Sequence, residues 1–454
     1  MSFRVRIIAS ALALSLAALA VTGAQAQSIT QALTRAYDYA PDLQAALLSA
    51  KSAAENVALA QAGKRPTVGA SLGGTYSGSL VNGEYSDGTA LTTGLSYNQT
   101  IFDNYRTDAD IEAARAGAEA AEYEIRNTEQ NVLLSVVQAY MSVLSDRQLV
   151  SLRQENVSFY QAQLSSSNDR LEVGEGTRID VAQARARLAQ GDATFQASTN
   201  SLEISRATFQ RYVGVQPQDL NASHNYSRLI PSSLQAAIAE AEVHHPALLG
   251  AKAAIRAAQA NSDGAQAEFG PTATVNGSVG SRWSEPNGAQ TDGFSASVGF
   301  QITVPIYAGG AIGATVRKAN IDQIRSEVDA MSAYDQIREA VISAWAGIQS
   351  ADAQISAANA AVSAGREVVD GVIQERDLGS KTTLDVLNAQ AELTSAREAL
   401  ITASSNKVVA TFSLLAAMGH LTARDLGLGV EVKSAVRYNQ AVEDVWQELR
   451  TVAE

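Results

Sequence analysis

The chain contains two related stretches, LEVGEGTRIDVAQARARL (Leu171–Leu188) and RDLGSKTTLDVLNAQAEL (Arg376–Leu393). Gly174 and Gly379 are 205 residues apart, and so are Asp180 and Asp385. Glycine tolerates the positive φ found where helices end, and a carboxylate suits the first turn of a helix. Each stretch therefore predicts a turn that leads from one helix into a returning helix.

The similarity between the two halves extends far beyond these turns. At the same shift of 205 residues, Pro41 falls on Pro246, Pro66 on Pro271 and Gly214 on Gly419, without a gap. A gapless match over this distance predicts a duplicated structural unit, with a period too long for a solenoid.

Each unit is expected to begin with two β-strands. From Pro66, apolar or aromatic residues such as Val68, Leu72 and Tyr76 alternate with polar ones, as in a strand with one apolar and one polar face. The expected strands cover about 66–80, 90–102, 271–285 and 292–306, and each is longer than the roughly 9 to 11 residues that cross a bilayer. Because four strands do not close a transmembrane barrel, several protomers would have to pool them. A soluble sandwich is the alternative.

The period changes to seven after each strand pair. The first unit has apolar residues at every seventh position from Val136 to Leu171, and the second repeats the pattern from Val341 to Val369. Sustained heptads specify a coiled coil, and the 67 proline-free residues from 104 to 170 predict a rod of about 100 Å. The expected helix hairpins cover about 104–214 and 309–419, with short helices at about 28–63 and 233–264.

Residues 1–26 have the pattern of an export signal: Arg4 and Arg6, an apolar stretch, and Ala24-Gln25-Ala26 as a cleavage site. Loss of the two arginines takes the net charge from -13 to -15, which argues against nucleic acid as a partner. There is no cysteine, and no later run of 18 apolar residues that would supply a membrane-spanning helix. The expected domains are 27–232 and 233–426, followed by a tail, 427–454, that has no counterpart in the first unit. Its segment VEDVWQELR suggests a short helix.

The sequence offers little for catalysis, metal binding or a cofactor. Adjacent His244 and His245 would point about 100 degrees apart on a helix, and no acidic partner is expected to join them. Gly309, Gly310 and Gly313 lie between a strand and a helix, but no Lys-Ser/Thr follows them, so a strand-to-helix corner is expected instead of a phosphate loop. We expect no enzyme activity, no metal and no cofactor.

Taken together, the export signal, the duplicated strand-strand-helix units, QTIFDNYRTDADIEAA (99–114) and VPIYAGGAIGATVRKA (304–319) resemble the TolC-type outer membrane channel-tunnel proteins. The resemblance covers about Gln27 to Leu426. It implies an α+β membrane protein that forms a homotrimer. Four transmembrane strands per protomer would contribute to a 12-stranded barrel surrounded by outer membrane lipid, and the helices would form a coiled-coil tunnel through the periplasm.

The resemblance also assigns roles to residues at the two turns. The periplasmic gate would contain Asp385, with Asn388 where the family has a second aspartate, Lys381 at a basic gating position, and Asp180 in the first copy. A periplasmic adaptor protein would dock on the matching tip residues, which are Arg170, Leu171, Val173, Gly174, Thr177, Leu378, Gly379 and Ser380.

The resemblance implies a passive conduit that receives its substrate from an inner membrane ABC or proton-driven pump. The first repeat is most similar to the branch that serves type I protein secretion, and efflux of small molecules is the alternative. A soluble periplasmic coiled-coil protein is the alternative of a different class.

Overall fold

The computed structural model describes residues 27–221, 225–286, 290–443 and 445. The export signal expected at residues 1–26 lies outside the described residues. The chain divides into two compact units. Unit 1 comprises 1–40, 130–237 and 341–430, and unit 2 comprises 41–129, 238–340 and 431–454.

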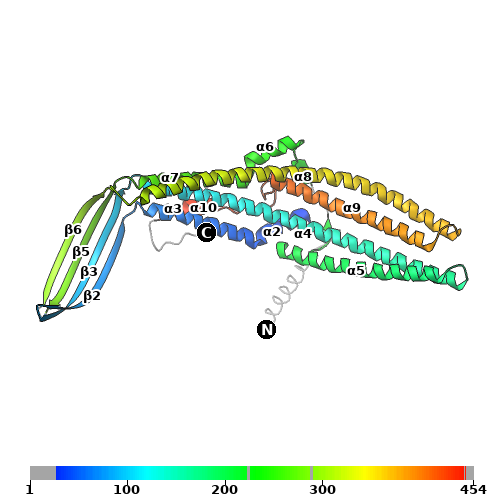
Figure 1. The fold of residues 1–454 in the computed structure, drawn as a ribbon, viewed down its shortest axis with the longest axis horizontal. Helices are drawn as coiled ribbons and strands as arrows, with labels where there is room; N and C mark the ends of the chain where they lie inside the picture. Colours follow the sequence, from blue (N-terminus) through cyan, green and yellow to red (C-terminus); the bar gives the residue numbers. More distant parts are fainter. Residues whose placement is uncertain (1–26, 222–224, 287–289, 444, 446–454) are drawn as a thin grey trace, which may run out of the picture. The chain divides into compact units, whose positions relative to one another are not determined.

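Unit 2 contains an antiparallel sheet of four strands in the order β2-β3-β5-β6 (Figure 1). The strands are β2 (Thr67–Val81), β3 (Glu84–Phe102), β5 (Thr272–Pro286) and β6 (Thr291–Thr303). Asn82 and Gly83 both have positive φ, 55° and 85°, as a two-residue hairpin turn requires. Because the turn is so tight, β3 begins earlier than the start expected near residue 90.

Two helix hairpins follow the two strand pairs. The outgoing helices are α4 (Arg106–Glu172) and α8 (Ala311–Asp377), each of 67 residues, and the returning helices are α5 (Arg178–Val213) and α9 (Thr383–Ala417). The bounds of α4 and α8 are 205 residues apart at both ends. The structure therefore contains the duplication that the sequence predicts.

A corner of left-handed backbone precedes each outgoing helix. Gly309 and Gly310 have φ of 61° and 84°, while the equivalent Asn104 and Tyr105 have 58° and 66°. The first copy thus reaches the same conformation without glycine, helped by a hydrogen bond from Asn104 Nδ2 to the Ala267 carbonyl oxygen (3.1 Å). The corner is a sufficient structural reason for Gly309 and Gly310.

Each repeat also carries a pair of short helices interrupted by proline. They are α2 (Ile29–Tyr39) with α3 (Pro41–Ala62), and α6 (Leu234–His244) with α7 (Pro246–Ala267). Proline lacks the backbone N–H that would continue a helix but fits the first turn of a new one. Pro41 and Pro246 therefore fix the breaks.

The core of unit 1 is built around Tyr140 of α4, which is fully buried. Its ring lies 6.2 Å from that of Phe209, and a second ring pair, Tyr226 of the 3₁₀ turn η2 (Tyr226–Leu229) with Phe412, is 5.5 Å apart. A two-residue parallel ladder joins β1 (Gln27–Ser28) to β4 (Leu220–Asn221), and the Tyr140 hydroxyl bonds to both strands. Aromatic packing and this ladder hold the start of the described chain in place.

The tail contributes α10 (Val436–Glu443) to unit 2. Glu443 forms an ion pair with Arg115 and accepts a hydrogen bond from Gln61 (3.2 Å), while the Tyr438 hydroxyl donates to Glu55 (2.7 Å). The helix thus lies earlier in the tail than VEDVWQELR, most of which is outside the described residues.

On the sequence alone, no segment after the export signal is expected to be apolar enough to cross a membrane, but helix α9 meets this criterion by length and composition. It contains an 18-residue window of mean hydropathy 1.3 with few charges. However, Phe412, Leu414 and Leu415 of this helix are fully buried in unit 1, and Lys407 pairs with Asp352 (2.6 Å). Packing within unit 1 therefore accounts for part of its apolar character, since 28% of this window is buried.

Candidate functional site

The first hairpin tip lies between α4 and α5. Gly174 has φ of +83°, and the backbone N–H groups of Glu175 and Gly176 both donate to the Arg170 carbonyl oxygen, at 2.8 and 2.9 Å. These bonds satisfy a carbonyl group that the end of α4 would leave without a partner. The turn is therefore tight and held by its own backbone.

The second tip, between α8 and α9, has a similar glycine turn. Gly379 has φ of +81°, and Ser380 donates to the Glu375 carbonyl oxygen from its N–H (2.9 Å) and from its hydroxyl (2.8 Å). Both tips belong to unit 1.

Asp180 and Asp385 play the same local part at the two tips. Each is the third residue of a capping box. The Oδ2 atom of Asp385 accepts hydrogen bonds from the N–H and hydroxyl of Thr382, both at 2.8 Å, and Asp180 does the same with Thr177 at 3.0 and 2.6 Å. Helix capping is thus a sufficient structural reason for both aspartates.

One carboxylate oxygen of Asp385 is not used in capping. No described group donates a hydrogen bond to its Oδ1 atom, and the pKa of its carboxyl group is lowered by the bonds from Thr382 and, to a smaller degree, by the charge of Lys381. The carboxylate is therefore ionised at neutral pH. Within the described chain, Lys381 forms no ion pair with Asp385 or any other carboxylate.

Asn388 lies one turn further along α9 and is exposed. Its Oδ1 atom accepts a hydrogen bond from a terminal guanidinium nitrogen of Arg187 on α5, at 3.0 Å. The sequence analysis did not identify Arg187, because the two residues are 201 positions apart and do not correspond to one another in the repeat. The contact links the two hairpins close to their tips.

Most of the residues expected to dock an adaptor are accessible, with Arg170 and Leu171 half-buried. The clearest apolar exposure is at Val173, which is 72% exposed, and at Leu378, which is 86% exposed. Neighbouring Ile179 is 68% exposed and was not among the expected residues. Exposed apolar side chains on both tips are typical of a contact surface.

Behind the tips, polar side chains are buried between the hairpins of unit 1. Arg376 is 7% exposed and donates to Gln163 Oε1 (2.5 Å), and the Asn156 Oδ1 atom accepts from Gln390 and Thr394, both at 3.3 Å. A polar cavity of about 160 Å³ lies beside Asn156.

Glu398 and Arg153 face this cavity and are 2.6 Å apart. Burial raises the pKa of Glu398, and Arg153 opposes that effect only in part. A layer of buried polar groups of this kind fixes helix register at some cost in stability.

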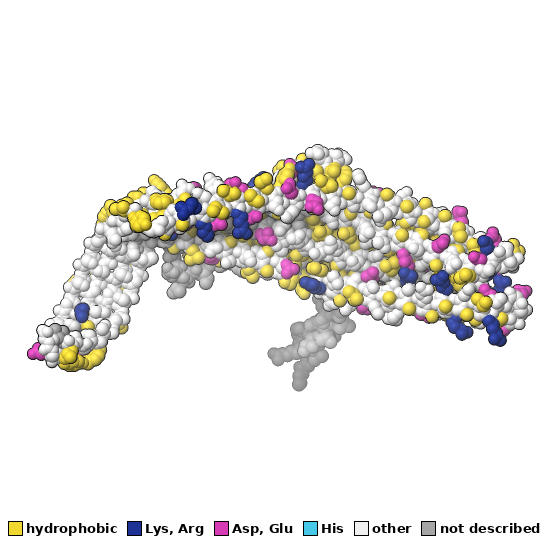
Figure 2. Space-filling model, viewed as in Figure 1, with side chains coloured by type: hydrophobic (Ala, Val, Ile, Leu, Met, Phe, Trp, Pro, Cys, Tyr) yellow, Lys and Arg dark blue, Asp and Glu magenta, His cyan; other side chains and the backbone are white. Residues whose placement is uncertain are grey.

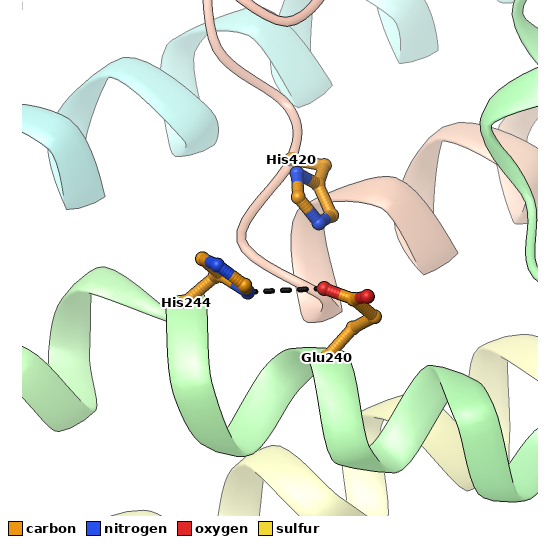
Figure 3. A group of neighbouring side chains, drawn as sticks. All are labelled: Glu240, His244 and His420. Carbon is orange, nitrogen blue, oxygen red and sulfur yellow. Dashed lines mark ion pairs between the residues drawn. The ribbon is translucent and has the colours of Figure 1, made fainter.

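The three described histidines lie at helix ends. Figure 3 shows His244 and Glu240 on successive turns of α6, where their ion pair measures 3.0 Å. The expectation that no acidic residue is spaced to join His244 was wrong, because Glu240 precedes it by four residues. His245 accepts a hydrogen bond from the Ala247 N–H as the cap of α7, and burial lowers its pKa to about 4. His420 contacts Asp425 (3.4 Å), and His224 lies outside the described residues.

Comparison with known proteins is consistent with this architecture. The model of the family "Outer membrane efflux protein" matches residues 32–215 and again 237–420, so the two matches are 205 residues apart. The outer membrane efflux protein BepC of Brucella suis is 35% identical over 98% of this chain and 97% of its own length.

More distant relatives and solved structures agree. The outer membrane protein TolC of Escherichia coli is 24% identical over 88% of this chain and 84% of that protein, and the alkaline protease secretion protein AprF of Pseudomonas aeruginosa is 25% identical over 76% and 73%. The crystal structure of the Campylobacter jejuni CmeC outer membrane channel superposes with a TM-score of 0.78 at 16% identity, covering 92% of this chain and 89% of that one. The chain therefore belongs to the outer membrane efflux protein family and is an outer membrane channel component of the TolC type, with a tunnel in the periplasm.

Proposed function

We propose that three copies of the chain pool their sheets into one 12-stranded barrel and conduct substrate passively, without enzyme activity, from an inner membrane pump and its adaptor to the outside. The observation that carries this proposal is the isolated sheet. Its order leaves one edge of β2 and one edge of β6 without a partner strand among the described residues, although both strands are long. Unpaired strand edges are unfavourable in a bilayer, and closure with other copies removes them.

The helix tips provide a gate in this proposal. Three copies of Asp385 around a narrow axis would repel one another and attract cations, because each carboxylate is ionised and has one oxygen free of hydrogen bonds. Lys381, unpaired within one protomer, is available to bind a carboxylate of the neighbouring copy and hold the ring closed. Asn388 leaves the second position neutral, and Asp180 supplies a further carboxylate on the first tip.

The tips also provide the docking surface. Val173 and Leu378 expose apolar surface beside the glycine turns, and an adaptor's coiled coil would cover them together with the other tip residues expected to dock. The pump behind the adaptor, ABC-type or proton-driven, supplies the energy.

Type I protein secretion is the cargo class that we favour, on the likeness to AprF, whose name states a protease secretion role. Small-molecule efflux is the second candidate, on the likeness to BepC, which is named an efflux protein. Deletion of the gene and complementation in the same strain separates the two. Protein secretion predicts the loss of specific proteins from the culture medium. Unchanged medium with raised sensitivity to dyes and detergents would contradict secretion and support efflux.

Planar-bilayer recording tests the channel and its gate. The purified protein is expected to migrate as a heat-modifiable trimer and to form cation-preferring channels. Asp385→Ala should raise conductance and weaken cation preference more than Asp180→Ala, the matched control with the same capping role. A soluble monomer would contradict the channel, and unchanged conductance and preference in Asp385→Ala would contradict the gate.

A further inference from the structure

The two faces of the sheet differ sharply in chemistry. Cross-strand register places Leu72, Leu95, Val279 and Val298 on one face, and these side chains are 45% to 87% exposed. Every strand residue in the sheet with a large exposed hydrophobic side chain, up to the bulge after Thr100, lies on this same face. An exposed, continuous apolar face of this kind suits the hydrocarbon of a membrane.

Apart from the strand-end positions Val81 and Pro286, the opposite face consists of serine, threonine, glycine, alanine, asparagine and glutamine, with two charged exceptions. Glu84 lies at the hairpin end of β3, and Arg282 lies within β5. Figure 2 shows a face of the sheet that is almost free of hydrophobic side chains, with dark-blue atoms near its free end. Arg282 is the only Lys or Arg in the four strands.

The neighbours of Arg282 leave its guanidinium uncovered. The register aligns it with Thr92 on β3 and Gly293 on β6, and Thr92 in turn with Gly73 on β2. None of these side chains is large enough to shield a guanidinium, and Arg282 is exposed. The only long side chain in this row of the sheet is therefore a cation.

No counter-charge is near on the same face. Asp87, Glu285 and Asp292 belong to the apolar face, because they align with its residues. Glu84 lies eight residues before Thr92, the β3 partner of Arg282, which is about 27 Å at 3.4 Å per residue and well beyond the Debye length at physiological salt. In the described chain Arg282 forms no ion pair.

We propose that the three Arg282 side chains of the trimer form a cationic collar on the pore wall near the outward end of the barrel, a site for multivalent oxyanions. The inference rests on the proposed trimeric barrel, in which the apolar face meets lipid and the polar face lines the pore. Arg282 lies four residues from the end of β5 at the hairpin side, about 13 Å from the loops. Guanidinium groups bind phosphate and carboxylate oxygens through paired N–H donors, and three in one ring focus a positive field on the passing solute.

The collar gives the channel opposite charge at its two ends, with Asp385 carboxylates at the proposed gate and arginines at the mouth. An anion entering from outside meets the collar first. A cation entering from the periplasmic end meets the carboxylates first.

Single-channel recording in bilayers of uncharged phosphatidylcholine tests the collar, with inorganic tripolyphosphate as the probe. Added on the outer side, tripolyphosphate should reduce the wild-type current in a voltage-dependent way. Arg282→Gln should require about tenfold more tripolyphosphate for the same block, whereas Arg282→Lys, which keeps the charge, should stay close to wild type. Arg282→Glu should abolish the block. Heat-modifiable migration of each variant shows that the trimer has assembled.

Equal block of the wild-type and Arg282→Gln channels would overturn the collar, and so would block from the periplasmic side alone. Those results leave the channel itself intact. A wild-type protein that forms no conducting trimer would instead overturn the proposed function and the collar with it.

Discussion

Replacing Tyr140 by phenylalanine isolates the bond that anchors the start of the described chain. The Tyr140 hydroxyl donates to the Gln27 carbonyl oxygen (2.5 Å) and accepts from the Asn221 N–H (2.7 Å), and the side chain is fully buried. Phenylalanine keeps the ring and its packing but removes both bonds. At about 0.5–1.5 kcal/mol for each hydrogen bond, the loss of stability amounts to about 1–3 kcal/mol. We expect Tm to fall by several degrees.

The matched control is Tyr160→Phe. Tyr160 is 5% exposed, lies in the same helix and has no hydrogen bond from its hydroxyl to any described group. Its replacement should leave Tm almost unchanged. Thermal unfolding of both variants, followed by far-ultraviolet circular dichroism in detergent at one scan rate, makes the comparison. Equal shifts in Tm for the two variants would refute the reasoning.

Alkaline pH adds a second readout for Tyr140. Burial raises the pKa of its phenol to about 12, above the value near 10 of an unfolded chain. The folded state therefore favours the neutral phenol, and this contribution is complete below pH 10 and is lost as the pH rises toward 12. Phenylalanine cannot ionise, so the stability difference between wild type and Tyr140→Phe should narrow over this range.

Two further perturbations concern the tips. Gly379→Ala should destabilise the second tip by about 1–2 kcal/mol, because the φ of Gly379 is +81°. Gly371→Ala should be neutral or stabilising, because Gly371 lies inside α8 with open space around it. Limited proteolysis at the tip measures the effect of both substitutions. Arg187→Ala and Asn388→Ala should raise channel conductance to a similar degree, because each substitution removes the same hydrogen bond. The double variant should therefore raise conductance no further than either single variant. Additive effects would show that this contact does not hold the two hairpins together.

The sequence was sufficient for the main features of the fold because they follow from periodicity. Heptads from Val136 and Val341 predicted the two long helices, alternation from Val68 predicted the strands, and the shift of 205 residues predicted their duplication. The turn at Asn82-Gly83 was also readable, since Asn-Gly is the strongest short hairpin signal, but the alternation of apolar and polar residues predicted too late a start for the next strand.

The polar contacts between the hairpins were not predictable in the same way. Arg187 bonds to Asn388 and Arg376 to Gln163, across 201 and 213 positions. Alignment of the two copies shows which residues occupy equivalent positions. The residues in each of these two contacts occupy non-equivalent positions, so the alignment does not reveal them. Only the three-dimensional packing of α4, α5, α8 and α9 brings these pairs together. The Glu240–His244 pair is different, because a spacing of four on one helix was available from the sequence.

The two tips show how one turn, copied, came to offer different chemistry. Capping does not distinguish Asp180 from Asp385, since both make the same bonds to the preceding threonine. The difference lies at the position of Gly176 in the first copy and Lys381 in the second. A Cβ atom at Gly176 would come within 3.0 Å of the Leu171 nitrogen and 3.2 Å of Arg170, so a side chain there would require the first turn to shift by a few tenths of an ångström. The second turn accepts one, and the residue it carries is a cation four positions before Asp385. The tip that carries this lysine is the one where we propose the charge-controlled gate.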